Sequence, residues 1–213
     1  FTTHAGSDNP HPGDARAQID IPTTTWNTET YIRDEHRLEV PAEILPVEYI
    51  LRVGLYDQKT NERLAVLNDQ GEVVGDAITL QPIQVLWARP PKPSYQERFV
   101  LGGQIEFMGY DLSATGLQAG ESLEVRLYWR AKAKVERDYT VFMHLLDEGG
   151  QMRGQKDSPP AEGMYPTTAW RTGQIVEDRR AIPLTVAPGR YRLAVGMYDL
   201  KTLERLEAMD ATG

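Results

Sequence analysis

Apolar and polar residues alternate with a period of two along several stretches of the chain. In residues 122–131, SLEVRLYWRA, the side chains of Leu123, Val125, Leu127 and Trp129 alternate with those of Glu124, Arg126, Tyr128 and Arg130. This period puts successive side chains on opposite faces and is typical of a strand that turns one face to a core. Residues 139–147, YTVFMHLLD, are nearly apolar throughout and predict a central strand buried on both faces.

Sustained helical periodicity is absent, and the prolines at 159, 160, 166, 183 and 188 would break a helix. Turn-forming stretches such as DEGGQ, APGR and NDQG separate short apolar segments. Many short strands joined by turns of Gly, Pro and Asp predict an all-β chain, built as an antiparallel β-sandwich of the immunoglobulin-like or jelly-roll kind with very little helix.

Two parts of the sequence repeat each other. The stretch IPTTTW at 21–26 returns as YPTTAW at 165–170, and Asp34 aligns with Asp178 further along. Residues 49–64, YILRVGLYDQKTNERL, then align with residues 191–206, YRLAVGMYDLKTLERL. An internal repeat of this length predicts tandem modules.

The repeat and a proline-rich stretch at 89–94, RPPKPS, define the predicted domains. Residues 1–88 form a partial module, the C-terminal half of a repeat with one further strand. Residues 89–96 form a linker, and residues 97–213 form a second module that lacks its last strand. One hypothesis is that residues 77–85 take the position of the missing strand, either in the second module or in a neighbouring chain. The alternative is a small N-terminal lobe of a few strands.

Composition narrows the function. A net charge of −8 and a pI near 5.1 argue against nucleic acid as a partner. Without cysteine the chain has no disulfides, thiolate metal sites or cysteine nucleophiles. Neither a membrane-spanning apolar run nor a signal peptide is visible, so we expect no membrane insertion of this chain. Because the sequence begins at Phe1 without methionine, we expect a piece of a larger protein.

The repeated tryptophans, Trp26 and Trp170, are the first candidates for a binding role. An exposed indole is a platform for the apolar face of a sugar, and polar neighbours complete such sites. In the second copy Tyr165, Arg171 and Asp178 would share that surface. The alternative is that each tryptophan caps the core of its own module.

The acidic residues point to structure more than to chemistry. Asp57 and Asp199 each begin the phrase D-x-K-T-x-E-R-L, where an Asp accepts hydrogen bonds from the amides two and three residues on and fixes a turn. The pairs Asp34/Glu35 and Glu177/Asp178 are adjacent in strand-like sequence and should point to opposite faces, unlike the paired carboxylates of a glycosidase. We expect no catalytic residue, metal or cofactor.

The phrases LYWRA, DYTVFMHLLDEGGQ, QKDSPPAEGMYPTTAW and PGRYRLAVGMYD resemble a recurrent β-sandwich module. That module is appended to large bacterial multi-pass membrane glycosyltransferases of the dolichyl-phosphate-mannose mannosyltransferase type. The resemblance implies an extracytoplasmic, non-catalytic accessory role that binds glycans or supports the membrane enzyme. A structural spacer or oligomerisation module without a ligand is the alternative. The expected partners are a glycan, a neighbouring domain of the parent protein, or a second copy joined through unpaired strands.

Overall fold

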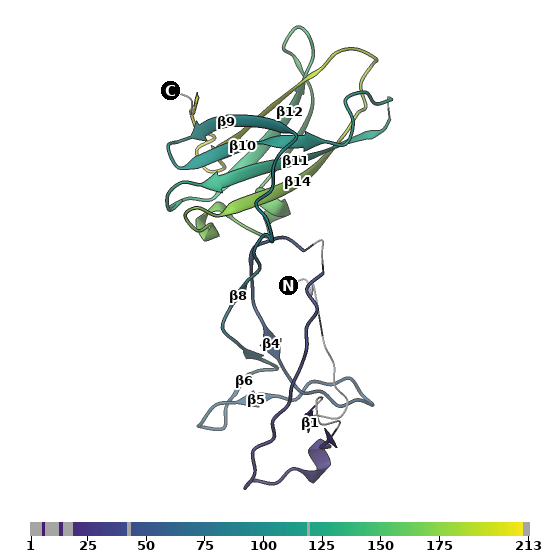
Figure 1. The fold of residues 1–213 in the computed structure, drawn as a ribbon, viewed down its shortest axis with the longest axis vertical. Helices are drawn as coiled ribbons and strands as arrows, with labels where there is room; N and C mark the ends of the chain where they lie inside the picture. The colour runs from purple at the N-terminus through teal and green to yellow at the C-terminus, as the bar shows by residue number, and fades with distance from the viewer. Residues whose placement is uncertain (1–5, 7–12, 15–18, 42–43, 119, 211–213) are drawn as a thin grey trace. The chain divides into compact units, whose positions relative to one another are not determined.

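The computed structural model describes the chain except for residues 1–5, 7–12, 15–18, 42–43, 119 and 211–213 (Figure 1). The described residues are strands, turns and short 3-10 segments, and the chain is all-β as predicted. The chain divides into two compact units, Phe1–Val85 and Leu86–Gly213. Residues 86–88, predicted to end the first module, thus go with the second unit, and the first strand after the proline-rich stretch already begins at Tyr95.

The first unit contains short strands joined in antiparallel pairs. The strands are β1 (Gly13–Asp14), β2 (Ile19–Asp20), β3 (Glu48–Tyr49), β4 (Arg52–Val53), β5 (Val66–Leu67), β6 (Val73–Gly75), β7 (Ile78–Thr79) and β8 (Ile83–Gln84), with the 3-10 segment η1 (Thr23–Thr25). The pairs are β1 with β2, β3 with β8, β4 with β7, and β5 with β6. The segment from β3 to β4 therefore runs antiparallel to the segment from β7 to β8.

The second unit is built from two antiparallel sheets. Its strands are β9 (Tyr95–Leu101), β10 (Ile105–Leu112), β11 (Ser122–Ala131), β12 (Tyr139–Leu146), β13 (Met152–Ser158), β14 (Ile175–Pro183), β15 (Arg192–Asp199) and β16 (Ala208–Asp210). The larger sheet has the order β14-β11-β10-β9-β16, and the smaller has the order β13-β12-β15. In Figure 1, β9, β10, β11 and β14 lie side by side in one layer.

The core of the second unit lies between these sheets. Alternation in β11 is confirmed, because the four predicted core residues are at most 7% exposed: Leu123, Val125, Leu127 and Trp129. Val141, Met143 and Leu145 of β12 are buried as well, and β12 is the central strand of its sheet, as predicted. Tyr128 of β11, expected to face outward, is also buried. Its hydroxyl donates to Asp111 at 2.7 Å, and burial together with this bond raises the pKa of Tyr128.

The repeated phrase G-x-Y-D-x-K-T-x-E-R-L folds in the same way in both units. Asp57 Oδ1 accepts hydrogen bonds from the amides of Lys59 and Thr60, as Asp199 Oδ1 does from those of Lys201 and Thr202. The predicted turn is confirmed. These amide bonds are the main reason that the pKa values of Asp57 and Asp199 lie below the ordinary value.

The backbone around this turn also matches between the units. The amide of Leu64 donates to Leu55 O at 2.9 Å, and the amide of Leu206 donates to Met197 O at 2.8 Å. The shared glycine has a steric reason, because a Cβ at Gly196 would lie 2.6 Å from the Phe142 ring and one at Gly54 would lie 2.9 Å from Asp76 O. The segment Tyr49–Leu55 is thus the structural counterpart of Tyr191–Met197, which consists of Tyr191 and the first six residues of β15.

Candidate functional site

The repeated Pro-Thr-Thr-x-Trp stretch is a 3-10 turn closed by its own tryptophan. In the first unit Trp26 Nε1 donates to Ile21 O at 3.0 Å, and in the second Trp170 Nε1 donates to Tyr165 O at 3.1 Å. The backbone amide of each tryptophan donates to the first threonine's carbonyl, at 3.2 Å in both copies. The repeated indole therefore fixes the local loop in each unit.

In the second unit this turn, η3 (Thr167–Ala169), also fixes the start of β12. Thr167 is completely buried; its hydroxyl donates to Arg137 O at 2.7 Å and accepts from the Tyr139 amide at 3.0 Å. The Thr168 hydroxyl donates to Asp138 Oδ1 at 2.7 Å. In the first unit the corresponding threonines are exposed, and its described residues include no counterpart of β12.

The predicted glycan-binding residues occupy different environments. Trp170 and Tyr165 are 3% and 5% exposed, so neither ring presents a face to a ligand. The Tyr165 hydroxyl is turned inward and lies within hydrogen-bond distance of two acceptors, Ala169 O at 3.1 Å and Gln174 Oε1 at 2.9 Å, between which its one hydrogen is shared. Trp26 is 37% exposed and Arg171 is exposed. A sugar platform stays a prediction at these two positions, whereas burial removes it from the rest of the set.

Asp178, the remaining member of the predicted set, belongs to a buried ion pair that joins the two sheets. Its carboxylate accepts from Arg180 Nε at 2.7 Å, and both side chains are fully buried. Arg180, from β14, donates across the sandwich to Val141 O at 3.2 Å and Ser158 O at 2.9 Å. Burial raises the pKa of Asp178, and the adjacent guanidinium opposes that rise. This carboxylate is a structural clamp.

The adjacent carboxylate points the other way, as the strand period predicts. Glu177 is paired with Arg179, whose side chain is about half exposed, while Asp178 pairs inside the sandwich. In the described part of the chain, no three His, Cys, Asp or Glu side chains gather where they could hold a metal ion. The geometry provides no acid and base facing each other across a cleft here.

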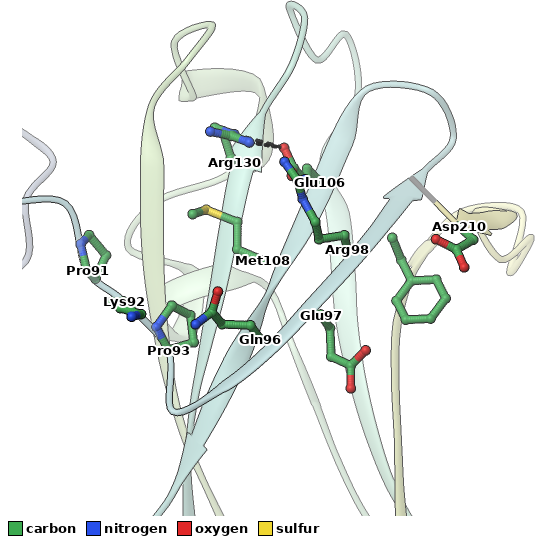
Figure 2. Close-up of a pocket in the computed structure, with 11 residues that line it drawn as sticks. Pro91, Lys92, Pro93, Gln96, Glu97, Arg98, Glu106, Met108, Arg130 and Asp210 are labelled. Carbon is green, nitrogen blue, oxygen red and sulfur yellow. Dashed lines mark hydrogen bonds and ion pairs between the residues drawn. The ribbon is translucent and has the colours of Figure 1, made fainter. Parts of the chain in front are cut away.

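A second cluster of charged residues lines a polar hollow of about 530 Å³ on the outer face of the larger sheet (Figure 2). Glu106 is only 4% exposed and accepts from Arg130 Nε at 2.8 Å, and Arg98 Nε lies 3.8 Å from the same carboxylate. Lys92, Pro93 and Met108 form part of the rim. Arg98 and Arg130 together carry one positive charge more than Glu106, and the lining as a whole has three basic side chains (Lys92, Arg98, Arg130) and three acidic ones (Glu97, Glu106, Asp210).

A second concavity of the second unit is an apolar groove of about 950 Å³ between the two sheets. Its walls come from β9 to β11 on one side and from β12 and β15 on the other, and they include Phe107, Leu127, Leu145, Leu193 and Val195. Leu193 and Val195 are half-buried although they lie on the inner face. The opposing sheet therefore does not fill the space over them.

One buried polar atom also lies in the wall of this groove. Trp129 is 1% exposed and lines the groove, and its Nε1 has no hydrogen-bond partner among the described residues. A buried donor without an acceptor is unfavourable, by about 1–3 kcal/mol. Side-chain atoms of His144 and Ser158, which do not line the groove, are likewise buried without a hydrogen-bond partner in the described part of the chain, so this feature is not specific to the groove.

The groove opens beside a strand edge that has no partner strand in the described residues. β15 is the last strand of the order β13-β12-β15. The turn that follows covers its C-terminal end, where Tyr198 bridges to Arg205. Residues 192–196 pair only with β12, through Arg192–Leu146 to Gly196–Phe142. An open edge beside an apolar groove is a place where another strand can add.

Comparison with known proteins places the chain in no family: no family model, no curated protein and no solved structure matches it. Among the described residues, no helix is both long and apolar enough to cross a membrane. The features that define the candidate site are therefore those of the fold itself, an all-β sandwich with an apolar groove and a free strand edge.

Sequence reasoning identified the strand but not the groove. The inward set Tyr191, Leu193 and Val195 follows from alternation, and the repeat shows that its counterpart in the first unit is followed by a further strand. The polar hollow was missed, because Glu106 and Arg130 read as ordinary outward residues. Their signal is opposite charge at directly paired positions, which only the register of β10 and β11 reveals.

The clamp gives the first prediction. Asp178→Asn leaves the Arg180 charge buried without its counter-ion, which should lower the free energy of unfolding of the second unit by about 3–5 kcal/mol. The measurement is urea unfolding followed by fluorescence in a Trp26→Phe background, because the other tryptophans, Trp87, Trp129 and Trp170, all lie in the second unit.

The matched control is Glu136→Gln in the same unit. Glu136 Oε1 lies 3.3 Å from Lys134 Nζ, and the two side chains are 70% and 76% exposed. Loss of this surface ion pair should cost about 0–1 kcal/mol. Equal losses in the two variants would show that the buried pair does not hold the sheets together.

Proposed function

We propose that this chain is a non-catalytic interaction region of a larger protein, and that its second unit binds an extended polypeptide segment as an added β-strand. The observation that carries the proposal is the apolar groove beside the free edge of β15. Added strands gain affinity from main-chain hydrogen bonds and specificity from side chains that enter a groove at alternate positions. The edge and the groove supply both.

The use of the repeated residues supports a non-catalytic role. Trp170 closes its own loop, Thr167 holds β12, Asp178 joins the sheets, and Asp199 fixes a turn. These residues, which the two copies share, thus all make structural contacts in the second unit. A region whose common features are structural fits a spacer or docking module better than an enzyme.

A place outside the cytoplasm, beside a membrane glycosyltransferase, is supported only by the resemblance of the sequence phrases. This location is part of the proposal, but strand binding in the groove does not depend on it. A strand-binding module would act in the same way on a partner domain of any parent protein.

A synthetic peptide with the sequence of residues 77–85 tests strand addition. The peptide has alternating apolar residues, and in the first unit this segment pairs with the counterpart of β15. Labelled peptide should bind the protein saturably in fluorescence anisotropy. Replacing Ile78 and Leu80 of the peptide by Ser should weaken binding by at least about tenfold, or about 1.4 kcal/mol, because these side chains enter the groove.

Two protein variants locate the peptide. Leu193→Glu puts a charge into the groove wall and should abolish binding. Ala194→Glu changes the next residue of the same strand, whose side chain points to the other face, and should leave binding within about twofold. Circular dichroism checks that both variants fold. Equal affinity of the two variants, or no peptide binding to the parent protein, contradicts strand addition at β15.

Glycan binding at Trp26 is a second candidate, favoured by the exposure of its ring. Stacking of a sugar on the indole should change its fluorescence when oligosaccharides are titrated, and Trp26→Ala should remove that change. Trp170→Ala is unsuitable as a probe because the side chain is buried. An unchanged emission spectrum across neutral, acidic and amino-sugar oligosaccharides would leave Trp26 as a loop-closing residue.

A further inference from the structure

The chain itself contains a strand that matches the groove. Residues 77–85, called here the donor segment, carry Ile78, Leu80 and Ile83, which are 54%, 43% and 40% exposed. In the first unit the donor segment pairs with Tyr49–Val53, which corresponds to Tyr191–Val195 of β15. The repeat therefore identifies the strand sequence that pairs with this edge.

The register in the first unit is explicit. Val53 pairs with Ile78 and Arg52 with Thr79, and the Leu80 amide donates to Leu51 O at 2.9 Å. Tyr49 pairs with Ile83. The pairing shifts by one residue between these two ladders, at the donor's Gln81 and Pro82. A proline fits there because a shift in the ladder leaves a position without an inter-strand N–H bond.

Transferred to the second unit, this register places Ile78 opposite Val195 and Leu80 opposite Leu193. Ile83 comes opposite Tyr191. All three acceptor residues line the groove. Residues directly opposite each other in a sheet project to the same face, so the three apolar donor side chains would enter the groove together. Thr79 would face outward opposite Ala194.

The gain in burial favours the transfer. In the first unit the donor segment is held by two ladders of two residues each, and its apolar side chains are about half exposed. In the groove the same side chains would lie between two sheets, beside Leu193 and Val195 of β15 and facing the wall that Phe99 and Leu101 of β9 line. Burial of apolar area is the main favourable contribution to such an association.

We propose that the groove of the second unit binds the donor segment of a second copy of this chain. The inference rests on the proposed strand-binding function and names its partner. A donor on one unit and an acceptor on the other make a contact that two copies can exchange reciprocally, as in a strand-swapped dimer, or propagate along a chain of copies.

The absence of cysteine makes the register testable by disulfide trapping. Thr79→Cys and Ala194→Cys are made as separate single variants and mixed under oxidising conditions. The bond between Leu80 N and Leu51 O makes the neighbouring position, Thr79 opposite Ala194, a non-hydrogen-bonded pair with Cα atoms about 4.5 Å apart. That separation suits a disulfide.

Thr79→Cys mixed with Arg192→Cys is the matched control, because Arg192 lies on the same strand and face but two residues out of register. We expect the covalent heterodimer of the Thr79→Cys and Ala194→Cys variants to be at least about tenfold more abundant than that of Thr79→Cys and Arg192→Cys. Adding Leu193→Glu to the Ala194→Cys copy should abolish the heterodimer. Sedimentation velocity of the unmodified protein should show a concentration-dependent dimer or larger species.

The outcomes separate this inference from the function on which it rests. Peptide binding without the trapped heterodimer, or with a monomer at every concentration, overturns the second copy as partner and leaves strand binding for another polypeptide. Equal trapping at 194 and 192 overturns the register. Failure of both peptide binding and trapping overturns the proposed function itself.

Discussion

Strand β15 leaves one side of its backbone without a partner strand among the described residues, and the proposed strand binding depends on this open edge. Free backbone groups at a sheet edge favour pairing with another strand, and proteins commonly protect such edges. Here the hairpin after Asp199 covers one end, whereas residues 192–196 stay open above an apolar groove. Main-chain hydrogen bonding and apolar burial thus favour the same event.

On the opposite side of the sandwich, side chains join the two sheets. Asp178 and Arg180 form a fully buried pair, and Arg180 spans the sheets to reach carbonyls of β12 and β13. Thr167 fixes the start of β12 from the same side. The sandwich is therefore clamped near β13 and β14 and left unfilled near β15, an asymmetry that allows a strand to enter without opening the fold.

Alternation was enough to predict β11 and its four core residues, and an apolar run was enough to predict β12, because both are local properties of the sequence. Burial of Trp170 was one of two open alternatives. The sequence could not decide between them, because the tryptophan closes the same turn in both copies and differs only in what packs against it.

The groove, the clamp and the Glu106 cluster depend on which strands face or neighbour each other. That information is non-local, and a single sequence does not contain it. The repeat was the exception. It aligns Tyr49–Val53 with Tyr191–Val195, and in the structure Tyr49–Val53 pairs with the donor segment. That pairing is the basis for the strand proposed at the equivalent edge of the second unit.

Amide hydrogen exchange at Leu193 and Val195 measures directly whether the edge of β15 is open and receives a strand. In the first unit the counterpart of Leu193 uses its backbone to pair with the donor segment, through Leu51 O. We expect fast exchange at both amides in dilute protein, and strong protection when the 77–85 peptide is added or the concentration is raised. Protection that is already complete in the dilute monomer, or that never changes, would contradict an open edge that receives a strand.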